Sequence, residues 1–515
     1  MRRLVLALGS GGLLCLAFPT FDVWVAAPVA LALLAWVVTG VGVRRGLGLG
    51  LASGLAFFVP SLHWSGIYVG SVPWLALAAL EALFVGLAGA LVGWLSRDGR
   101  VRPVAFALAW TVTEELRGVA PYGGFPWMKL AFGQADSPMG RLVAVGSTPL
   151  VAFVVALVGG LLAAAAASAL RRMPPRRVAL PAVLALGLGG IGLVVPLPTD
   201  GPTAQIVGIQ GNVPRAGLDF NAERRQVLDN HVATTKHVAA EVAEGALPRP
   251  DLVVWPENSS DIDPLRNADA KAEILDVVDE IRAPVIVGGL LEEPAPNLSN
   301  ASLLYEPGRG LTARYVKRHP VPFGEYIPNR AFFRLLSDQV DLVRRDFAAG
   351  TRPGVFDIAT ASGPVRAGLA ICFEVAYDDI MRDVVRGGAN LLVVQTNNAT
   401  FGFTAESPQQ LAISRVRAME FGRSVAHVST VGQSALITPD GTAHQVTSLF
   451  SRAVVSGALP LRDATTVATR LGAAPDWLAA AALLALVGDN LVRRRTADGA
   501  PTKAPTKDED DDDQA

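Results

Sequence analysis

The sequence predicts an α-helical membrane domain of eight transmembrane helices and an α/β domain inserted before the last of them. Three observations lead to this prediction. The chain of 515 residues is 51% hydrophobic and has a mean hydropathy of +0.37, which is too apolar for an ordinary soluble protein. Its long apolar runs lie before residue 200 and again near the C-terminus. Between them, short apolar runs alternate with helical patterns, which is typical of a layered α/β domain.

Seven apolar segments precede residue 200, and an eighth lies near the C-terminus. Most of them are about 20 residues long, which is enough for a helix to cross the hydrocarbon core of a bilayer. The segments span 4–20, 23–43, 47–68, 72–95, 103–120, 141–170, 178–196 and 473–492. We therefore predict a membrane domain at 1–200 with seven transmembrane helices, and an eighth transmembrane helix at 473–492.

Arginine clusters alternate with loops that contain no Lys or Arg. The clusters precede the first segment, separate the second from the third, the fourth from the fifth and the sixth from the seventh, and follow the eighth. Because basic loops stay on the cytoplasmic side, we expect both termini in the cytoplasm and the domain at 202–470 outside. Residues 493–515, which include "DEDDDD" at 508–513, are expected to form a disordered cytoplasmic acidic tail.

Charge and cysteine content argue against several classes of protein. The formal net charge is −1, so we expect no nucleic-acid partner. Two cysteines cannot make a disulfide framework, and Cys15 in its apolar run is expected to pack as a small hydrophobe. The six histidines show no metal-ligand spacing, and 202–470 contains no P-loop or dinucleotide fingerprint. We therefore expect no cofactor and no metal.

The domain at 202–470 contains strand-like apolar runs with helical patterns between several of them. The strand-like runs are 204–212, 251–258, 284–290, 365–374, 389–398 and 424–432. The helical patterns are 221–244, 269–282, 375–387 and 406–421. Such alternation predicts an α/β domain with largely buried sheets.

Polar residues gather where these strands end, which is where α/β folds place their chemistry. Glu257 in "WPEN", Lys317 in "ARYVKRHPVPFGEYIP" and Cys372 in "ICFE" each follow a strand. Cys372 is expected to stand just before a helix, whose N-terminus would favour the thiolate. A carboxylate can take the thiol proton, and an ammonium can stabilise an oxyanion. The three residues together suit acyl transfer through a thioester.

Each of these residues also has a purely structural interpretation. Cys372 can be a buried thiol, Glu257 a capping or loop carboxylate, and Lys317 part of a surface basic cluster. The charged stretch at 113–117, at the end of the fifth segment, can anchor the protein at the interface or face lipid headgroups. The residues taken singly leave these alternatives open.

In this order, "WPEN", "KRHPVPFGEYIP" and "ICFE" resemble the Glu-Lys-Cys motifs of the carbon–nitrogen hydrolase (nitrilase-like) superfamily. With eight apolar segments around an external domain, the chain resembles one family in particular, the bacterial apolipoprotein N-acyltransferases. The likeness includes "GFPW" at 124–127, "QGNVP" at 210–214 and "TNNATFG" at 396–402. It implies an αββα sandwich for 202–470, and a multi-pass location in the bacterial inner membrane with this domain extracytoplasmic.

The resemblance also implies roles for five residues. Glu257 would be the general base, Lys317 the cation that stabilises the oxyanion, and Cys372 the nucleophile. Glu325 and Glu374 would be supporting acidic residues.

The implied reaction is a ping-pong transfer of a fatty acyl chain, the last step of lipoprotein maturation. The donor would be a phospholipid of the bilayer, by resemblance phosphatidylethanolamine, and the acceptor the N-terminal amine of a diacylglyceryl-cysteine apolipoprotein. Phe373 and Thr400 stand where the family commonly has Tyr and Trp. We expect these two differences to affect contacts with the substrates. The apolar segment 329–350, with Phe332, Phe333, Leu335, Leu336 and Phe347, is expected to be either a lid that keeps water from the thioester or ordinary core.

Two other functions fit the sequence less well. A membrane-anchored nitrilase-like amidase that hydrolyses an external amide would need far fewer than eight spans. A non-catalytic binding or transport protein would not need Glu257, Lys317 and Cys372 intact. A transporter would also need charged residues deep in its spans, and most spans have none.

Overall fold

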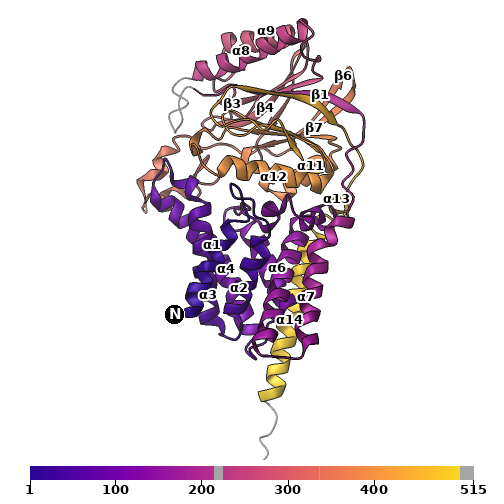
Figure 1. The fold of residues 1–515 in the computed structure, drawn as a ribbon. Helices are drawn as coiled ribbons and strands as arrows, with labels where there is room; N and C mark the ends of the chain where they lie inside the picture. The colour runs from indigo at the N-terminus through magenta and orange to yellow at the C-terminus, as the bar shows by residue number, and fades with distance from the viewer. Residues whose placement is uncertain (214–223, 336, 499–515) are drawn as a thin grey trace, which may run out of the picture.

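The computed structural model describes residues 1–213, 224–335 and 337–498. A bundle of helices forms one end of the molecule and an α/β sandwich forms the other (Figure 1). The N-terminus and the end of α14 (Ala474–Asp498) both lie at the end of the bundle away from the sandwich. The first residues of the acidic tail predicted at 493–515 are helical rather than disordered, because α14 continues through 493–498, and the remainder, including 508–513, lies outside the described residues.

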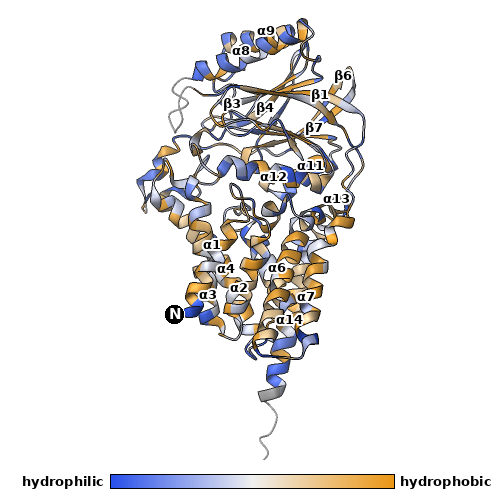
Figure 2. Ribbon diagram, viewed as in Figure 1, coloured by the Kyte–Doolittle hydropathy of each residue, from blue (hydrophilic) through white to orange (hydrophobic). Residues whose placement is uncertain are grey.

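Each of the eight apolar segments contains a helix of the bundle. With α14, these are α1 (Arg2–Cys15), α2 (Ala26–Val38), α3 (Val43–Ser61), α4 (Ser71–Leu95), α5 (Pro103–Arg117), α6 (Val143–Leu170) and α7 (Pro175–Gly190). Within the described residues, four helical stretches are long and apolar enough to cross a membrane, namely Ser71–Leu95, Pro138–Leu170, Pro175–Val194 and Ala474–Thr496. Figure 2 shows mainly hydrophobic residues along the bundle, as expected of a surface in contact with lipid.

Glycines allow α3 and α4 to approach closely. A Cβ atom added to Gly46 would lie 2.3 Å from the carbonyl oxygen of Gly89, and one added to Gly50 would lie 2.4 Å from that of Val85. Small residues at such contacts are typical of helices that pack inside a membrane, where backbone proximity replaces the hydrophobic effect.

The sandwich consists of two six-stranded mixed sheets. The first has the order β12-β1-β2-β3-β4-β5 and the second β11-β10-β9-β8-β7-β6. The first comprises β1 (Thr203–Gln210), β2 (Leu252–Val254), β3 (Val285–Leu291), β4 (Ser299–Glu306), β5 (Gly310–Val316) and β12 (Ala453–Pro460). The second comprises β6 (Val355–Thr360), β7 (Gly363–Ile371), β8 (Leu391–Thr396), β9 (Ser424–Ser429), β10 (Ala435–Ile437) and β11 (Ala443–His444).

Parallel pairing at the centre of each sheet determines where the site forms. β1, β2 and β3 are parallel to one another, as are β7, β8 and β9. Their carboxyl ends therefore meet at common edges, where loops can bring side chains together. Antiparallel strands complete both sheets on either side.

Helices cover the outer face of each sheet, which gives four layers (Figure 1). α8 (Arg224–Ala243) and α9 (Ala268–Ile281) cover the first sheet on the side away from the bundle. α11 (Asp378–Arg386) and α12 (Glu406–Phe421) lie between the second sheet and the bundle. An apolar core fills the space between the sheets, and a second lies under α8 and α9.

The layer formed by α11 and α12 shares its apolar core with the bundle. Met381 of α11 and Phe421 of α12 belong to the same buried cluster as Trp127 and Phe132 from the connection between α5 and α6. The sandwich is thus packed onto the bundle rather than tethered beside it.

Each strand-like run and each helical pattern predicted from the sequence contains the expected element. The run at 251–258 is the largest overestimate, because β2 covers only Leu252–Val254 and the chain then turns into the site. The strands β4, β6, β10, β11 and β12 were not predicted. They carry mixed or short apolar patterns, and their place in the sheet depends on partners far away in the sequence.

Candidate active site

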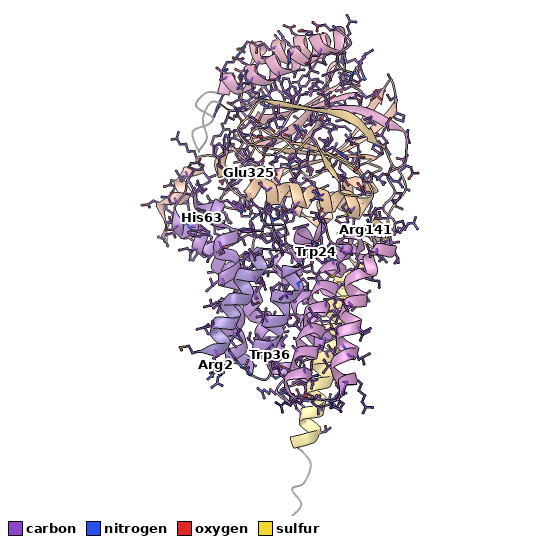
Figure 3. All side chains as sticks on the ribbon, in the orientation of Figure 1. Arg2, Trp24, Trp36, His63, Arg141 and Glu325 are labelled. Atoms are coloured by element: carbon purple, nitrogen blue, oxygen red, sulfur yellow. The ribbon has the colours of Figure 1, made fainter. Side chains whose placement is uncertain are left out.

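Glu257, Lys317 and Cys372 come together at one end of the sandwich. Lys317 Nζ lies 3.5 Å from Glu257 Oε1 and donates to Glu325 Oε1 at 3.0 Å. Cys372 lies near both groups, because the charges of Glu257 and Lys317 act on the pKa of its thiol in opposite directions. Figure 3 labels Glu325, which lies at the lower, bundle-facing part of the sandwich, on the flank where His63 of the bundle is found.

These side chains meet because of the strands they follow. Glu257 follows β2 and Cys372 follows β7, whose carboxyl ends lie on facing sheets. Lys317 is the first residue after β5, and its backbone amide donates to Asn300 O in β4 at 2.9 Å. The sequence thus predicted residues that the fold brings together from three separate strand ends.

Asn300 is a member of the site that the sequence did not single out. Its Nδ2 donates to Glu257 Oε1 at 2.6 Å and to Glu325 Oε1 at 3.1 Å. It therefore bridges the same two carboxylate oxygens that Lys317 Nζ contacts. No sequence pattern pointed to Asn300, because it lies in β4, a strand that the sequence did not predict.

Cys372 occupies a strained backbone position. Its φ is +55°, in the left-handed region that non-glycine residues rarely adopt. Such outliers persist where the surroundings force them, and they cluster at functional sites. The side chain keeps partial exposure, and Gln410 Nε2 of α12 donates to its Sγ at 3.6 Å. Gln410 also carried no signal in the sequence.

We expected Cys372 to stand directly before an α-helix, and this expectation is wrong. A short 3₁₀ turn (Cys372–Ala376) follows β7, and α11 begins only at Asp378. Burial raises the pKa of the Cys372 thiol, and the negative charge of Glu257 adds to this effect more than Lys317 offsets it. These effects favour the neutral thiol of Cys372 over its thiolate.

Charge in the site is arranged around one cation. Burial alone would lower the pKa of Lys317, but Glu325 and Glu257 raise it above its ordinary value, so the ammonium persists. Burial raises the pKa of Glu257, and Glu325 raises it further, while Lys317 lowers it. A carboxylate with a raised pKa is a better proton acceptor, as a general base requires.

Glu374 ties the nucleophile turn to the lysine loop. Its buried carboxylate accepts from the backbone N–H groups of Ile371 (2.8 Å), Arg318 (2.7 Å) and His319 (3.1 Å) and from Tyr315 Oη (2.8 Å). Burial raises its pKa despite these donors. Glu374 is thus placed to position Lys317 and Cys372 relative to each other rather than to react.

The bundle forms the floor beneath the nucleophile. Phe373 stacks on Phe125 and Trp127 of the "GFPW" stretch, with ring centroids 5.3 and 5.4 Å apart. Tyr377 Oη donates to Gly124 O at 3.0 Å. Gln409, next to Gln410, accepts from Trp127 Nε1 at 2.8 Å. The aromatic residue after Cys372 is therefore a packing contact with the membrane part.

The charged stretch at 113–117 does neither of the two things expected of it. Arg117 is buried and donates to Glu81 Oε2 at 2.9 Å and to Trp127 O at 2.7 Å, so it holds the "GFPW" loop. Glu115 Oε2 accepts from Lys129 Nζ at 2.6 Å, and Lys129 also donates to Asp378 of α11 at 2.8 Å. These charges organise the contact between bundle and sandwich.

Segment 329–350 presents apolar side chains at the surface. Phe332 is 56% exposed and Leu335 is 84% exposed, while Phe333 contacts Phe323 and Tyr122 edge to face. Leu336 lies outside the described residues. Phe332 and Leu335 therefore do not belong to a packed core.

Comparisons with known proteins agree over most of the chain. A family described as apolipoprotein N-acyltransferase N-terminal domain matches residues 10–161, and one described as carbon-nitrogen hydrolase matches residues 224–469. The chain is 40% identical to apolipoprotein N-acyltransferase of Mycolicibacterium smegmatis, over 90% of this chain and 81% of that protein. It is 27% identical to the enzyme of the same name from Photobacterium profundum, over 92% of each chain.

Among solved structures, an amidase of the nitrilase superfamily from Nesterenkonia AN1 aligns with 51% of this chain and 92% of its own. The identity is 15% and the TM-score 0.37. Within the described residues, the fold is a helical region with three candidate spans, then a nitrilase-like α/β sandwich of two mixed sheets, and then a fourth candidate span at Ala474–Thr496.

Proposed function

The chain belongs to the apolipoprotein N-acyltransferase family of the nitrilase superfamily, and we propose that it transfers the acyl group through a thioester on Cys372. The observation that carries this proposal is the convergence of Glu257, Lys317 and Cys372 from three strand ends, directly above the bundle.

In the first half-reaction, Cys372 Sγ attacks the ester carbonyl of a phospholipid while Glu257 takes the thiol proton. The Lys317 ammonium stabilises the oxyanion of the tetrahedral intermediate. When this intermediate collapses, the ester C–O bond breaks and Glu257 returns the proton to the leaving oxygen. A lysophospholipid departs and the acyl group remains on sulfur.

In the second half-reaction, the α-amine of a diacylglyceryl-cysteine apolipoprotein attacks the thioester carbonyl. Glu257 takes a proton from the nitrogen, the C–S bond breaks, and the proton returns to Sγ. The product is an amide. Glu325 supports Lys317 through its ion pair, and Glu374 positions the two loops.

The membrane arrangement belongs to the same proposal. We place domain boundaries at 1–200, 202–470, 473–492 and 493–515, with eight membrane helices rather than four. Two facts support an extracytoplasmic sandwich and cytoplasmic termini: the arginine clusters, and the position of both described ends of the chain opposite the sandwich (Figure 1). In the bacterial inner membrane, the donor, by preference phosphatidylethanolamine, and the lipid-anchored acceptor would then share the outer leaflet.

Water must be kept from the thioester, or hydrolysis would compete with transfer to the amine. The exposed apolar side chains of 329–350, among them Phe332 and Leu335, are suited to contact lipid at the site entrance. They would serve as the lid that admits acyl chains and excludes water.

The thioester is tested by intact mass after incubation with phosphatidylethanolamine of defined chain length. We expect a hydroxylamine-labile acyl adduct on the wild type and on Cys15→Ala, and none on Cys372→Ala. Cys15 is the matched control because these two are the only cysteines of the chain. An adduct that persists in Cys372→Ala would refute the assignment. Lysophospholipid without an adduct or acylated acceptor would identify an enzyme that only hydrolyses.

A further inference from the structure

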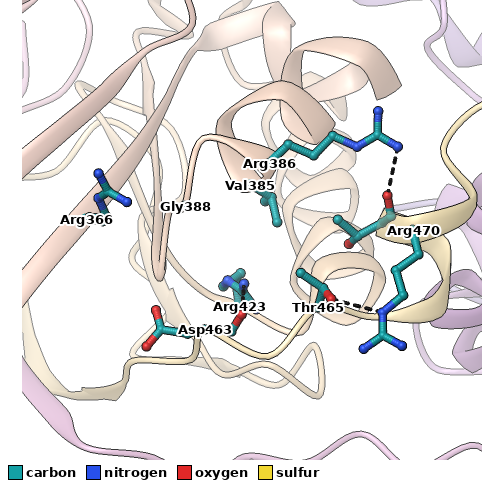
Figure 4. Close-up of a pocket in the computed structure, with 9 residues that line it drawn as sticks. Arg366, Val385, Arg386, Gly388, Arg423, Asp463, Thr465 and Arg470 are labelled. Carbon is teal, nitrogen blue, oxygen red and sulfur yellow. Dashed lines mark hydrogen bonds between the residues drawn. The ribbon is translucent and has the colours of Figure 1, made fainter.

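A cleft of about 690 Å³ lies on the flank of the sandwich, where α11 ends and α13 (Val467–Leu471) begins (Figure 4). Four arginines and one aspartate are among its lining residues, which gives it an excess of three positive charges. They are Arg366, Arg386, Arg423, Arg470 and Asp463. The catalytic residues do not line it.

Two of the four guanidinium groups are available to a ligand. Arg386 Nη2 donates to Thr469 O at 3.1 Å, and Arg470 Nε donates to Thr465 Oγ1 at 3.1 Å (Figure 4). Within the described part of the chain, neither has a carboxylate partner. Both side chains are exposed, so most of their donors face the cleft or solvent.

The other two arginines shape the cleft. Arg423 is buried and donates to backbone carbonyls that include Ala389 O and Ala464 O, both at 2.7 Å. Arg366 pairs with Asp357 at 2.5 Å. Burial lowers the pKa of Arg423 to about 10, so the group still carries its charge at neutral pH. A buried cation beneath two unpaired ones makes an anion the expected ligand.

The cleft lies at the depth of the membrane surface. Arg470 is four residues before Ala474, where the candidate span Ala474–Thr496 begins. Trp477, in the first turn of that helix, is 74% exposed, as suits an aromatic ring at a bilayer interface. Figure 1 shows α13 between the sandwich and the tops of α6 and α7.

The cleft is separate from the catalytic centre. Arg366 precedes Cys372 by six residues of extended strand, which corresponds to about 20 Å. Gly388 and Arg423 stand just before β8 and β9, at the edge of the sheet opposite the one where the nucleophile lies.

We propose that this cleft binds the phosphate of an anionic phospholipid, in the leaflet on which the sandwich rests. Guanidinium groups match phosphate oxygens in pairs of parallel hydrogen bonds, and basic groups at a membrane surface attract anionic lipid. The bound lipid is not the one being deacylated, since its phosphate is held away from Cys372. It fixes the flank of the sandwich against the bilayer while the other end of the sheet works on substrate.

The test uses the full chain in non-ionic detergent with Cys372→Ala as the background, so that no lipid is consumed. Binding of phosphatidylglycerol, phosphatidylcholine and inorganic phosphate is measured by native mass spectrometry. The variant R386Q/R470Q removes two exposed charges and should fold. The matched control K236Q/K271Q removes two exposed charges from α8 and α9, on the face farthest from the membrane.

We expect the background protein and the control to prefer phosphatidylglycerol over phosphatidylcholine by at least about tenfold, the effect of one pair of charge-assisted hydrogen bonds. R386Q/R470Q should lose this preference. Equal preference in R386Q/R470Q and the control would overturn the proposal. So would inorganic phosphate that binds as tightly as phosphatidylglycerol, because the ligand would then be a soluble anion. The result does not depend on whether Cys372 forms a thioester.

Discussion

Glu257, the proposed base, lies close to Glu325 as well as to Lys317. Burial raises the pKa of Glu257 and the charge of Glu325 raises it further. A general base works only when ionised, so the rate of thioester formation should fall as the pH drops through this raised pKa. The acid limb should therefore lie above the value of about 4.3 that is ordinary for glutamate.

Replacing Glu325 tests whether Glu257 is the group whose titration produces the acid limb. Glu325→Gln removes the neighbouring negative charge, which should lower the pKa of Glu257 and move the acid limb of the residual activity to lower pH. Single-turnover thioester formation across pH measures this directly. Glu280→Gln, an exposed change at the end of α9, should leave the limb in place. An acid limb that stays put in Glu325→Gln would contradict Glu257 as the titrating base.

Some residues of the site could be predicted from the sequence, and others could not. Glu257, Lys317 and Cys372 stand at the ends of strands, where a local pattern and a motif coincide. Asn300 and Gln410 contact the same groups, yet they lie inside a strand and a helix and have ordinary neighbours in the sequence. Their position depends on which elements pack together, and no short stretch encodes that.

Among the elements, the contact between α3 and α4 makes the sharpest prediction. A Cβ atom on Gly89 would lie 2.4 Å from Gly46 O, whereas one on Gly48 would meet nothing within 4 Å. Alanine favours a helix over glycine by about 1 kcal/mol. Gly48→Ala should therefore be neutral or stabilising, while Gly89→Ala should lower the melting temperature in detergent because the helices must separate. Equal melting temperatures for the two variants would show that the helices are not held this closely.

Elements with a strong local signal were predicted well. The apolar segments and the buried parallel strands carry it along their whole length, as in β8, all of whose residues are buried. The edge strand β6 alternates between buried and exposed residues, and β11 has two residues. Such strands are specified by the neighbour with which they pair, not by their own composition.

For the whole molecule, the junction of bundle and sandwich contains buried ion pairs as well as the shared apolar core. Lys129 lies between Glu115 and Asp378 and is nearly inaccessible. Lys129→Gln should destabilise the protein by about 3 kcal/mol, since removing one partner leaves buried carboxylates without a full complement of cations. Arg417 also pairs with Asp378 and would still neutralise it in the variant. We therefore expect a loss of stability at the low end of the range for broken buried ion pairs.

The control for this prediction is another ion pair across the same junction. Arg415 pairs with Asp136 at the rim, where both side chains are partly exposed, at 23% and 54%. Arg415→Gln should change stability by less than about 1 kcal/mol. Thermal unfolding in detergent compares the two variants. If both lower the melting temperature alike, burial does not determine the strength of this junction.

The apolar core that α11 and α12 share with the bundle has a consequence for how the protein is made. The ribosome completes α1 to α7 before it begins the sandwich, and domains generally form in the order of synthesis. The surface that receives Met381 and Phe421 is therefore already made when these residues are synthesised. Moving the sandwich ahead of the bundle by circular permutation would leave that face uncovered during biogenesis, when an exposed apolar layer invites aggregation.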